Sequence, residues 1–299
     1  MNAPDNKKIA IIDIGSNSVR IKIFCGRKIL FKDLITSQLS EGISDGKLDY
    51  KSIIRTFEAI DSFVSKAKSQ GAIVYAFATA AVRNTLSKQN FIEEFYKRYG
   101  FELDVLSGEK EAEIGLFGAL EKNDGCVLDI GGASTEIAVR QSEKIIYSHS
   151  LPLGAVVLTD KFEKNKEDCQ KYLSNAFLSY GNIPSSQKYV CIGGTATTLA
   201  FIKSGQKTYN SDVVHGTVLT KQFILKLVDY FYNTDYAVIA EKLNLNLKRA
   251  RVIHSGAVIL LQALESLKIN EITVSESDNL EGYYYSKVVA KMGDADNEK

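Results

Sequence analysis

Two short stretches of the chain share one arrangement of acid, glycine and hydroxyl residues. The first, Ile9–Ser18, reads IAIIDIGSNS, and the second, Cys126–Glu136, reads CVLDIGGASTE. In each stretch an apolar run typical of a buried strand ends at an aspartate, and a glycine turn with short polar side chains follows. Glycine lets peptide N–H groups approach an anion, because no Cβ stands in the way. The pattern predicts two anion-binding turns, which we expect to face each other across a cleft and to hold a phosphate chain.

The side chains of these turns are short donors that suit phosphoryl oxygens. Arg20, just beyond the first turn, adds a positive charge. The alternative for each turn is an ordinary hairpin with polar residues, which the presence of a second copy makes less attractive. The residues that we predict to bind phosphate are Gly15, Ser16, Asn17, Ser18 and Arg20 in the first copy and Gly131, Gly132, Ser134 and Thr135 in the second.

The presence of acidic residues beside a phosphate site needs an explanation, because carboxylates and phosphates are both negative and repel each other. A Mg²⁺ ion between acid and phosphate would supply it, since Mg²⁺ prefers hard oxygen ligands and keeps several waters. We therefore predict Asp13, Asp129 and Glu136 as Mg²⁺ ligands, partly through water. Glu136 could instead orient an attacking water. The alternative for Asp13 and Asp129 is that each aspartate caps its own turn.

The bulk composition narrows the class of protein. The chain has 299 residues, of which 45% are apolar and 24% charged, so it is ordinary globular material with enough length for two cores. A net charge of +1 attracts polyanions weakly, and duplex nucleic acid is not an expected partner. The four cysteines form no C-x-x-C pair, which argues against structural zinc. The N-terminus is polar, and the longest apolar run, Gly256–Leu264, is shorter than the roughly 20 residues of a membrane helix. We expect a cytoplasmic protein without membrane contact.

The elements that would position these residues come in two successive rounds. The first round has expected strands at 9–12, 19–24, 28–31, 73–78 and 103–106 and helices at 52–69, 88–99 and 108–120. The second has expected strands at 127–128, 135–139, 144–148, 189–192 and 271–274 and helices at 155–180, 194–202, 223–232, 255–267 and 280–290. The repeated order predicts an α/β protein of two lobes, 1–122 and 123–299, each with a mixed sheet flanked by helices. The last helix could pack back on the first lobe. Ligands are expected in the interdomain cleft.

Six motifs occur in an order that resembles one family. They are IIDIGSNSVR at 11–20, ATAAVRN at 78–84, SGEKEA at 107–112, VLDIGGASTE at 127–136, IGGTATTL at 192–199 and VHGTVLT at 214–220. This succession resembles the exopolyphosphatase / guanosine pentaphosphate phosphohydrolase family of the actin-like ATPase superfamily. The resemblance covers residues 9 to about 282 and implies two ribonuclease-H-like lobes. It also implies the short, two-domain form of the family.

The resemblance implies an activity and assigns further residues. It implies a bacterial cytoplasmic hydrolase of the stringent response that releases terminal phosphate from inorganic polyphosphate or guanosine pentaphosphate by Mg²⁺-assisted attack of water. It assigns Glu111 as the catalytic glutamate, beside Glu136, and Arg83 as a phosphate-binding arginine. A homodimer is left open. The alternatives are a non-catalytic sensor of polyphosphate or alarmone and a small-molecule kinase on the same scaffold.

Three positions depart from the family's pattern. Glu113 stands where arginine is common, Ala133 where a third glycine is usual, and Leu280 where a basic residue precedes Glu-Gly. The first and third substitutions remove positive charge, and the second adds a methyl group to the turn. Glu113 indicates weaker binding of a long polyanion or a smaller substrate, whereas Ala133 is expected to be tolerated. The three departures together suggest the sensor alternative.

Three further features allow two interpretations each. The pair Gly193–Gly194 either packs a helix against a strand or contacts a guanosine or distal phosphate. The cluster Lys248, Arg249 and Arg251 is either a solvated helix face or a guide for a polyphosphate tail. His215 is interpreted as a structural histidine rather than a catalyst.

Overall fold

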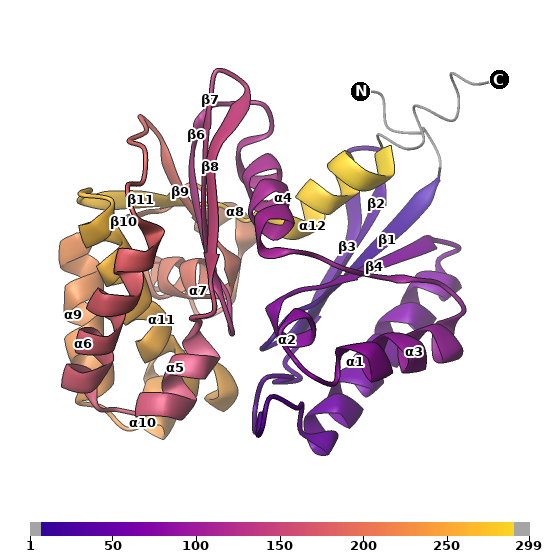
Figure 1. Ribbon diagram of the computed structural model, residues 1–299, viewed down its shortest axis with the longest axis horizontal. Coiled ribbons are helices and arrows are strands. Elements are labelled where there is room, and N and C mark those ends of the chain that lie inside the picture. Colours follow the sequence, from indigo (N-terminus) through magenta and orange to yellow (C-terminus); the bar gives the residue numbers. More distant parts are fainter. Residues whose placement is uncertain (1–6, 290–299) are drawn as a thin grey trace. The chain divides into compact units, whose positions relative to one another are not determined.

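The chain divides into two α/β units in the computed structural model, which describes residues 7–289 (Figure 1). The first unit consists of the chain up to Gly118 together with the segment from Asn279 onward. The second unit runs from Ala119 to Asp278. Each unit has its own sheet and its own core.

The first unit is built on a five-stranded mixed sheet with the order β3-β2-β1-β4-β5. Its central strand β1 pairs antiparallel with β2 and parallel with β4, so the carboxyl ends of β1 and β4 lie at one edge. The strands are β1 (Lys8–Ile14), β2 (Val19–Cys25), β3 (Lys28–Ile35), β4 (Ile73–Ala78) and β5 (Leu103–Val105).

Helices cover both faces of this sheet (Figure 1). Alternate residues of β1 point to opposite faces: Ala10 and Ile12 join the core under α1 (Tyr50–Ser69) and α3 (Lys88–Tyr99). Ile9 and Ile11 join a second core with α4 (Gly108–Leu120) and α12 (Asn279–Tyr283). A short helix, α2 (Ala80–Arg83), follows β4 directly, and α12 continues as a π-helical segment, Tyr284–Val289.

The second unit repeats the first sheet and extends it to the order β10-β11-β9-β6-β7-β8. Here β6 is the central strand, antiparallel to β7 and parallel to β9. The strands are β6 (Gly125–Ile130), β7 (Thr135–Gln141), β8 (Lys144–Leu151), β9 (Tyr189–Ile192), β10 (Val218–Thr220) and β11 (Glu271–Val274). The register shift between Ile23 and Phe24 in the first sheet has its counterpart between Val139 and Arg140 in the second.

The core of the second unit is organised around one buried helix, α11 (Leu247–Ser266). Apolar residues lie on every side of α11 in its second half, which is why it packs inside the unit rather than on its surface. The other helices are α5 (Ala155–Phe162), α6 (Lys166–Phe177), α7 (Gly193–Ser204), α8 (Ser211–Val214), α9 (Lys221–Tyr232) and α10 (Tyr236–Lys242), with a 3₁₀ turn at Leu178–Tyr180.

The predicted α/β class with two mixed sheets flanked by helices is confirmed. Several element predictions were wrong in detail. The helix expected over 155–180 is broken after Phe162, because Asn165 caps a new helix by accepting the amide of Asp168. The helix expected from 255 begins at Leu247, because the side chain of Asn246 caps it. The predictions missed β10 and α10, and the end of the helix expected over 280–290 lies outside the described residues.

Among residues 7–289, no helix is long and apolar enough to cross a membrane.

Candidate active site

The two predicted turns have the same backbone geometry. In the first unit the amide of Gly15 donates to the carbonyl of Ser18 over 3.1 Å, and in the second the amide of Gly131 donates to that of Ser134 over 3.0 Å. A Cβ on either glycine would lie only 3.0 to 3.1 Å from that same carbonyl oxygen, so the turn needs glycine for close approach. Because both amides serve the turn itself, the anion-binding prediction rests on the other groups of the two turns.

In each unit, the segment that follows the third strand of the sequence donates a backbone hydrogen bond to the turn. In the first unit the amide of Ser40 donates to the carbonyl of Ser16 over 3.0 Å. In the second unit the amide of Val156, in the first turn of α5, donates to the carbonyl of Gly132 over 2.8 Å. Gly154 precedes α5, and a Cβ there would lie 2.3 Å from the carbonyl carbon of Gly132. The second turn is therefore hydrogen-bonded to the first turn of a helix, whereas the first turn is hydrogen-bonded to a loop.

The acid of the first hairpin has a basic partner. Asp13 on β1 lies opposite Arg20 on β2, and Arg20 Nε donates to Asp13 Oδ2 over 2.9 Å, with a second bond from Nη2. The two residues were predicted as a metal ligand and a phosphate ligand, and the ion pair between them was not foreseen. It leaves this pair of opposite residues close to neutral.

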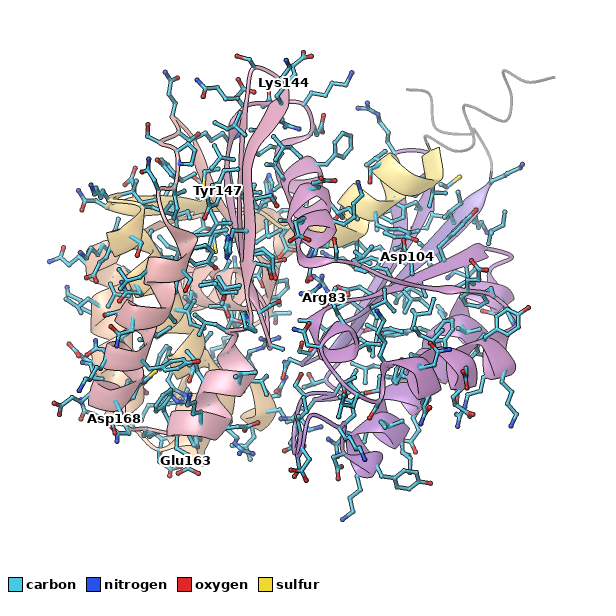
Figure 2. The ribbon with its side chains drawn as sticks, viewed as in Figure 1. Arg83, Asp104, Lys144, Tyr147, Glu163 and Asp168 are labelled. Carbon is cyan, nitrogen blue, oxygen red and sulfur yellow. The ribbon has the colours of Figure 1, made fainter. Side chains whose placement is uncertain are left out.

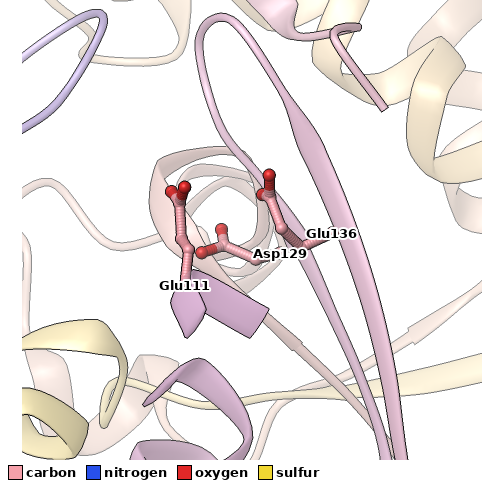
Figure 3. Close-up of side chains that lie close together, drawn as sticks. All are labelled: Glu111, Asp129 and Glu136. Carbon is pink, nitrogen blue, oxygen red and sulfur yellow. The ribbon is translucent and has the colours of Figure 1, made fainter. Parts of the chain in front are cut away.

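The acid of the second hairpin has an acidic partner. Asp129 on β6 lies opposite Glu136 on β7, and carboxylate oxygens of the two lie within 4.8 Å of each other (Figure 3). Glu136 Oε1 accepts a hydrogen bond of 2.6 Å from Ser150 on β8. Two carboxylates at this spacing repel each other unless a cation lies between them. Their hard oxygen atoms suit a divalent ion such as Mg²⁺, so the residues present fit the predicted metal.

The start of α7 is pressed against Asp129. Gly193 has a φ of +87°, and a Cβ on it would lie 2.5 Å from Asp129 Oδ1. The N-terminus of a helix carries partial positive charge, so it is an electrostatically favourable neighbour for the side chain of Asp129. The Gly193–Gly194 pair therefore permits close packing, in agreement with one of its two interpretations. Gly194 allows Arg249 the same close approach, since a Cβ on Gly194 would lie 2.8 Å from Arg249 Nη1.

Arg83 and Glu111 meet within the first unit. Arg83, labelled in Figure 2, ends α2, and Glu111 lies in the first turn of α4. Arg83 Nη1 donates to Glu111 Oε2 over 2.7 Å and to the carbonyl of Leu106 over 2.9 Å. The resemblance assigned one residue to phosphate and the other to catalysis, and the structure shows that each orients the other. Figure 3 also labels Glu111, which belongs to the first unit.

The side-chain hydroxyl groups of Ser18 and Thr135 already take part in hydrogen bonds within their own units. Asn17 Nδ2 donates to Ser18 Oγ over 3.2 Å, which ties two predicted ligands together. Thr135 Oγ1 donates to the carbonyl of Leu153 over 2.6 Å, inside the second unit. The geometry of Thr135 favours a structural role over the predicted phosphate contact.

The departures from the family pattern have visible consequences. Ala133 has a φ outside the left-handed region, so its methyl group causes no backbone strain there. Glu113 forms a 2.5 Å ion pair with Lys110 on the exposed side of α4. His215 Nδ1 accepts the amide of Glu276 over 3.2 Å, in keeping with a structural histidine.

Sequence reasoning missed three residues that hold the two hairpins in place. They are Ser150, which binds Glu136; Gly154, which lets α5 reach the turn; and Lys22, which forms a 2.5 Å ion pair with Glu281 of α12. The register of the second hairpin could have indicated Ser150, because a residue opposite Glu136 on the next strand must share its face. No local signal marks the other two.

The two sheets with flanking helices place the chain in the actin-like fold class. Residues 22–291 match the sequence profile of the Ppx/GppA phosphatase family, and the chain belongs to that family. The identification from six motifs is thus confirmed.

Three relatives illustrate the similarity. The chain is 27% identical to a "Bifunctional 3-dehydroquinate synthase/phosphatase" of Fusobacterium nucleatum, covering 91% of this chain and 45% of the relative. It is 26% identical to a "Guanosine-5'-triphosphate,3'-diphosphate pyrophosphatase" of Vibrio cholerae, covering 93% and 59%. It is 32% identical over 165 residues to "Exopolyphosphatase 1" of Mycobacterium bovis, covering 51% and 48%. The chain spans about half the length of these curated relatives.

A solved structure extends the similarity to three dimensions. The Ppx/GppA family member of Aquifex aeolicus is 27% identical and superposes with a TM-score of 0.78, covering 95% of this chain and 98% of that one.

Proposed function

We propose that this protein is a phosphohydrolase that releases the terminal phosphate of a phosphoanhydride chain, with inorganic polyphosphate or guanosine pentaphosphate as substrate. The observation that carries the proposal is the facing pair of carboxylates, Asp129 and Glu136, beside a glycine turn. The family and the names of the relatives support the reaction class. The proposal places Mg²⁺ as cofactor on this pair, with Asp13 contributing through water.

The two turns would bind the phosphate chain. In the proposal both turns approach one substrate, and their remaining amides and hydroxyls contact its oxygens. Arg83 would bind the terminal phosphoryl group, because its planar guanidinium can serve a phosphate and still contact Glu111. Mg²⁺ bound at Asp129 and Glu136 would neutralise phosphoryl charge.

Glu111 would direct the attacking water. The water oxygen forms a bond to the terminal phosphorus while the bridging P–O bond breaks, and the carboxylate of Glu111 accepts the water's proton. The displaced oxygen leaves on the shortened chain. Arg83 orients Glu111 before the reaction, since it already contacts Oε2 at 2.7 Å. Direct attack fits because the sequence has no G-x-S-x-G nucleophile turn.

The experiment measures phosphate release from short polyphosphate, long polyphosphate and guanosine pentaphosphate side by side, with and without Mg²⁺. Glu111→Gln should lower kcat by at least about 100-fold and leave substrate binding largely intact. Glu113→Gln is the matched control, because it makes the same change two residues further along the helix at a residue paired with Lys110. That control should keep near-native phosphate release.

The outcomes separate the proposal from its rivals. Near-native release by Glu111→Gln would show that another group directs the water. Binding of polyphosphate without any release, unaffected by Glu111→Gln, would instead support a sensor. Phosphate transfer from ATP to a small acceptor, with ADP as product, would support a kinase.

A further inference from the structure

We infer that Ser150 is a positioning residue for the metal site, a role that no motif of the sequence assigns to it. The inference rests on the proposed function, since it concerns the carboxylate of Glu136. Ser150 Oγ donates to Glu136 Oε1 over 2.6 Å, a short bond of the kind that hydroxyl groups make to ionised carboxylates.

The bond is built into the register of the sheet. Glu136 on β7 lies opposite Ser150 on β8 and opposite Asp129 on β6, so the three side chains form one line across three strands. All three positions belong to the second unit. The serine is therefore held on the same face as both carboxylates without help from a loop.

The corresponding line in the first unit has a different third member. There Asp13 and Arg20 are followed on β3 by Leu34, which lies opposite Arg20. An arginine has only donor groups, so a hydroxyl donor beside it would serve no purpose, and an apolar residue stands next to it. Where the second residue is a glutamate, the third is a hydroxyl donor. The pairing of glutamate with serine is specific to the acidic copy.

A glutamate side chain has three rotatable bonds, and fixing them when a metal binds costs conformational entropy. A side chain that is already held in one orientation loses less entropy on binding. The bond from Ser150 holds Oε1 on the side of β8 and thereby fixes the orientation of the carboxylate group beside Asp129. Donors that orient ligands in this way commonly change metal affinity or activity by 10- to 100-fold when they are removed. The role assigned to Ser150 is therefore to lower the metal concentration that the site requires.

The test uses Ser150→Ala in the full chain. Phosphate release is measured against Mg²⁺ concentration, and Mn²⁺ binding is measured directly by electron paramagnetic resonance without substrate. We expect the concentration for half-maximal activity and the Mn²⁺ dissociation constant to rise about 10-fold or more. At saturating Mg²⁺, kcat should return to within about threefold of the native value. Ser150→Thr keeps the hydroxyl and should restore both constants.

Ser174→Ala is the control, because it removes a serine hydroxyl that donates to the carbonyl of Gln170 in the same unit. It should move neither metal constant. If Ser150→Ala changes only the thermal unfolding temperature and leaves both metal constants native, the serine is merely structural and the inference fails. If Glu136→Gln also leaves Mn²⁺ binding native, it is the proposed metal site that fails, and the two failures are thereby distinguished.

Discussion

The two hairpins have nearly the same backbone, but one carries a neutral pair of side chains and the other an acidic pair. Each has a central strand, a glycine turn closed by one amide bond, and an antiparallel second strand. In the first hairpin the aspartate faces Arg20, and in the second the aspartate faces Glu136. At the position opposite the aspartate, the first hairpin has an arginine and the second has a glutamate. The first pair is therefore neutral, whereas the second is acidic and favours a cation.

The two copies therefore share a geometry rather than a chemistry. The neutral pair of the first hairpin suits an anion above it, because the charge of Asp13 is already balanced. The acidic pair of the second suits a divalent ion, which can then hold a phosphate. Under the proposed function the first turn would contact phosphate and the second would hold the metal.

The largest effect is expected from making the second hairpin resemble the first. Glu136→Arg places a guanidinium opposite Asp129, as Arg20 lies opposite Asp13. It should lower phosphate release by at least about 100-fold and abolish the Mg²⁺ dependence, because an ion pair replaces the metal site. Phosphate release and Mn²⁺ binding are the measurements. Glu143→Arg, at the exposed β7–β8 turn, makes the same charge change and should leave both properties native. A variant Glu136→Arg that still required Mg²⁺ would contradict the assignment.

A smaller loss is expected from a methyl group placed beside Asp129. In Gly193→Ala the new Cβ would lie 2.5 Å from Asp129 Oδ1, so the carboxylate must move. Phosphate release should fall about 10- to 100-fold, with a raised Mg²⁺ requirement. The φ of +87° adds a backbone penalty of about 1 kcal/mol.

Gly205→Ala separates these two causes. Gly205 caps the other end of the same helix with a φ of +65°, and nothing lies within 4 Å of its Cβ position. It should show the loss of stability in urea unfolding without the loss of activity. Equal activity losses in the two variants would mean that strain, rather than the position of Asp129, is responsible.

The first hairpin should respond in binding rather than in metal dependence. Arg20→Gln removes the charge that faces Asp13, so KM should rise about 10-fold while kcat stays within about threefold. The Mg²⁺ concentration for half-maximal activity should change by less than about threefold, because Asp13 contributes to the metal only through water in the proposal. Steady-state kinetics at several Mg²⁺ concentrations give all three values, and Arg27→Gln in the exposed β2–β3 turn is the control. A larger change of the Mg²⁺ requirement in Arg20→Gln would remove the distinction between the hairpins.

The sequence predicted the fold class and the two turns because both depend on local signals. Apolar runs that end at Asp13 and Asp129, with glycines after them, specify strand and turn within ten residues. The ion pairs could not be predicted in this way. Arg20 and Asp13 are close only through the hairpin register, and Arg83 meets Glu111 only after two helices and a strand have packed.

The break after Phe162 was missed for a similar reason. The residues from Glu163 to Asp168 are all polar and Asn165 among them caps the next helix, while Glu163 adopts a φ of 45° that its sequence does not announce. Tertiary contacts hold this conformation, since the carbonyl of Glu163 accepts a bond of 2.7 Å from His254 Nε2 of α11. Such contacts override local propensity, and single-sequence reasoning does not detect them.

The smallest effect on activity concerns what holds the second turn in place. The first turn is hydrogen-bonded to a loop, but the second is hydrogen-bonded to α5. Hydrogen bonds that involve Thr159, Ser255 and His254 in turn connect α5 to α11. All three histidines of the chain lie in the second unit. Burial lowers the pKa of His254 from 6.5 to about 4, because the apolar surroundings disfavour the charged ring.

The sign of the pH dependence follows from this lowered pKa. Between about pH 6.5 and pH 4 the unfolded chain binds a proton at His254 that the folded chain does not, so acid favours unfolding. The free energy of unfolding should fall by up to about 1.4 kcal/mol per pH unit in this window, and the contribution is fully retained above it. Urea unfolding at several pH values measures the slope, which His254→Gln should flatten. Activity near neutral pH should stay native in this variant, because the turn moves only if α5 loses its support. An unchanged slope in His254→Gln would show that another group causes the acid sensitivity.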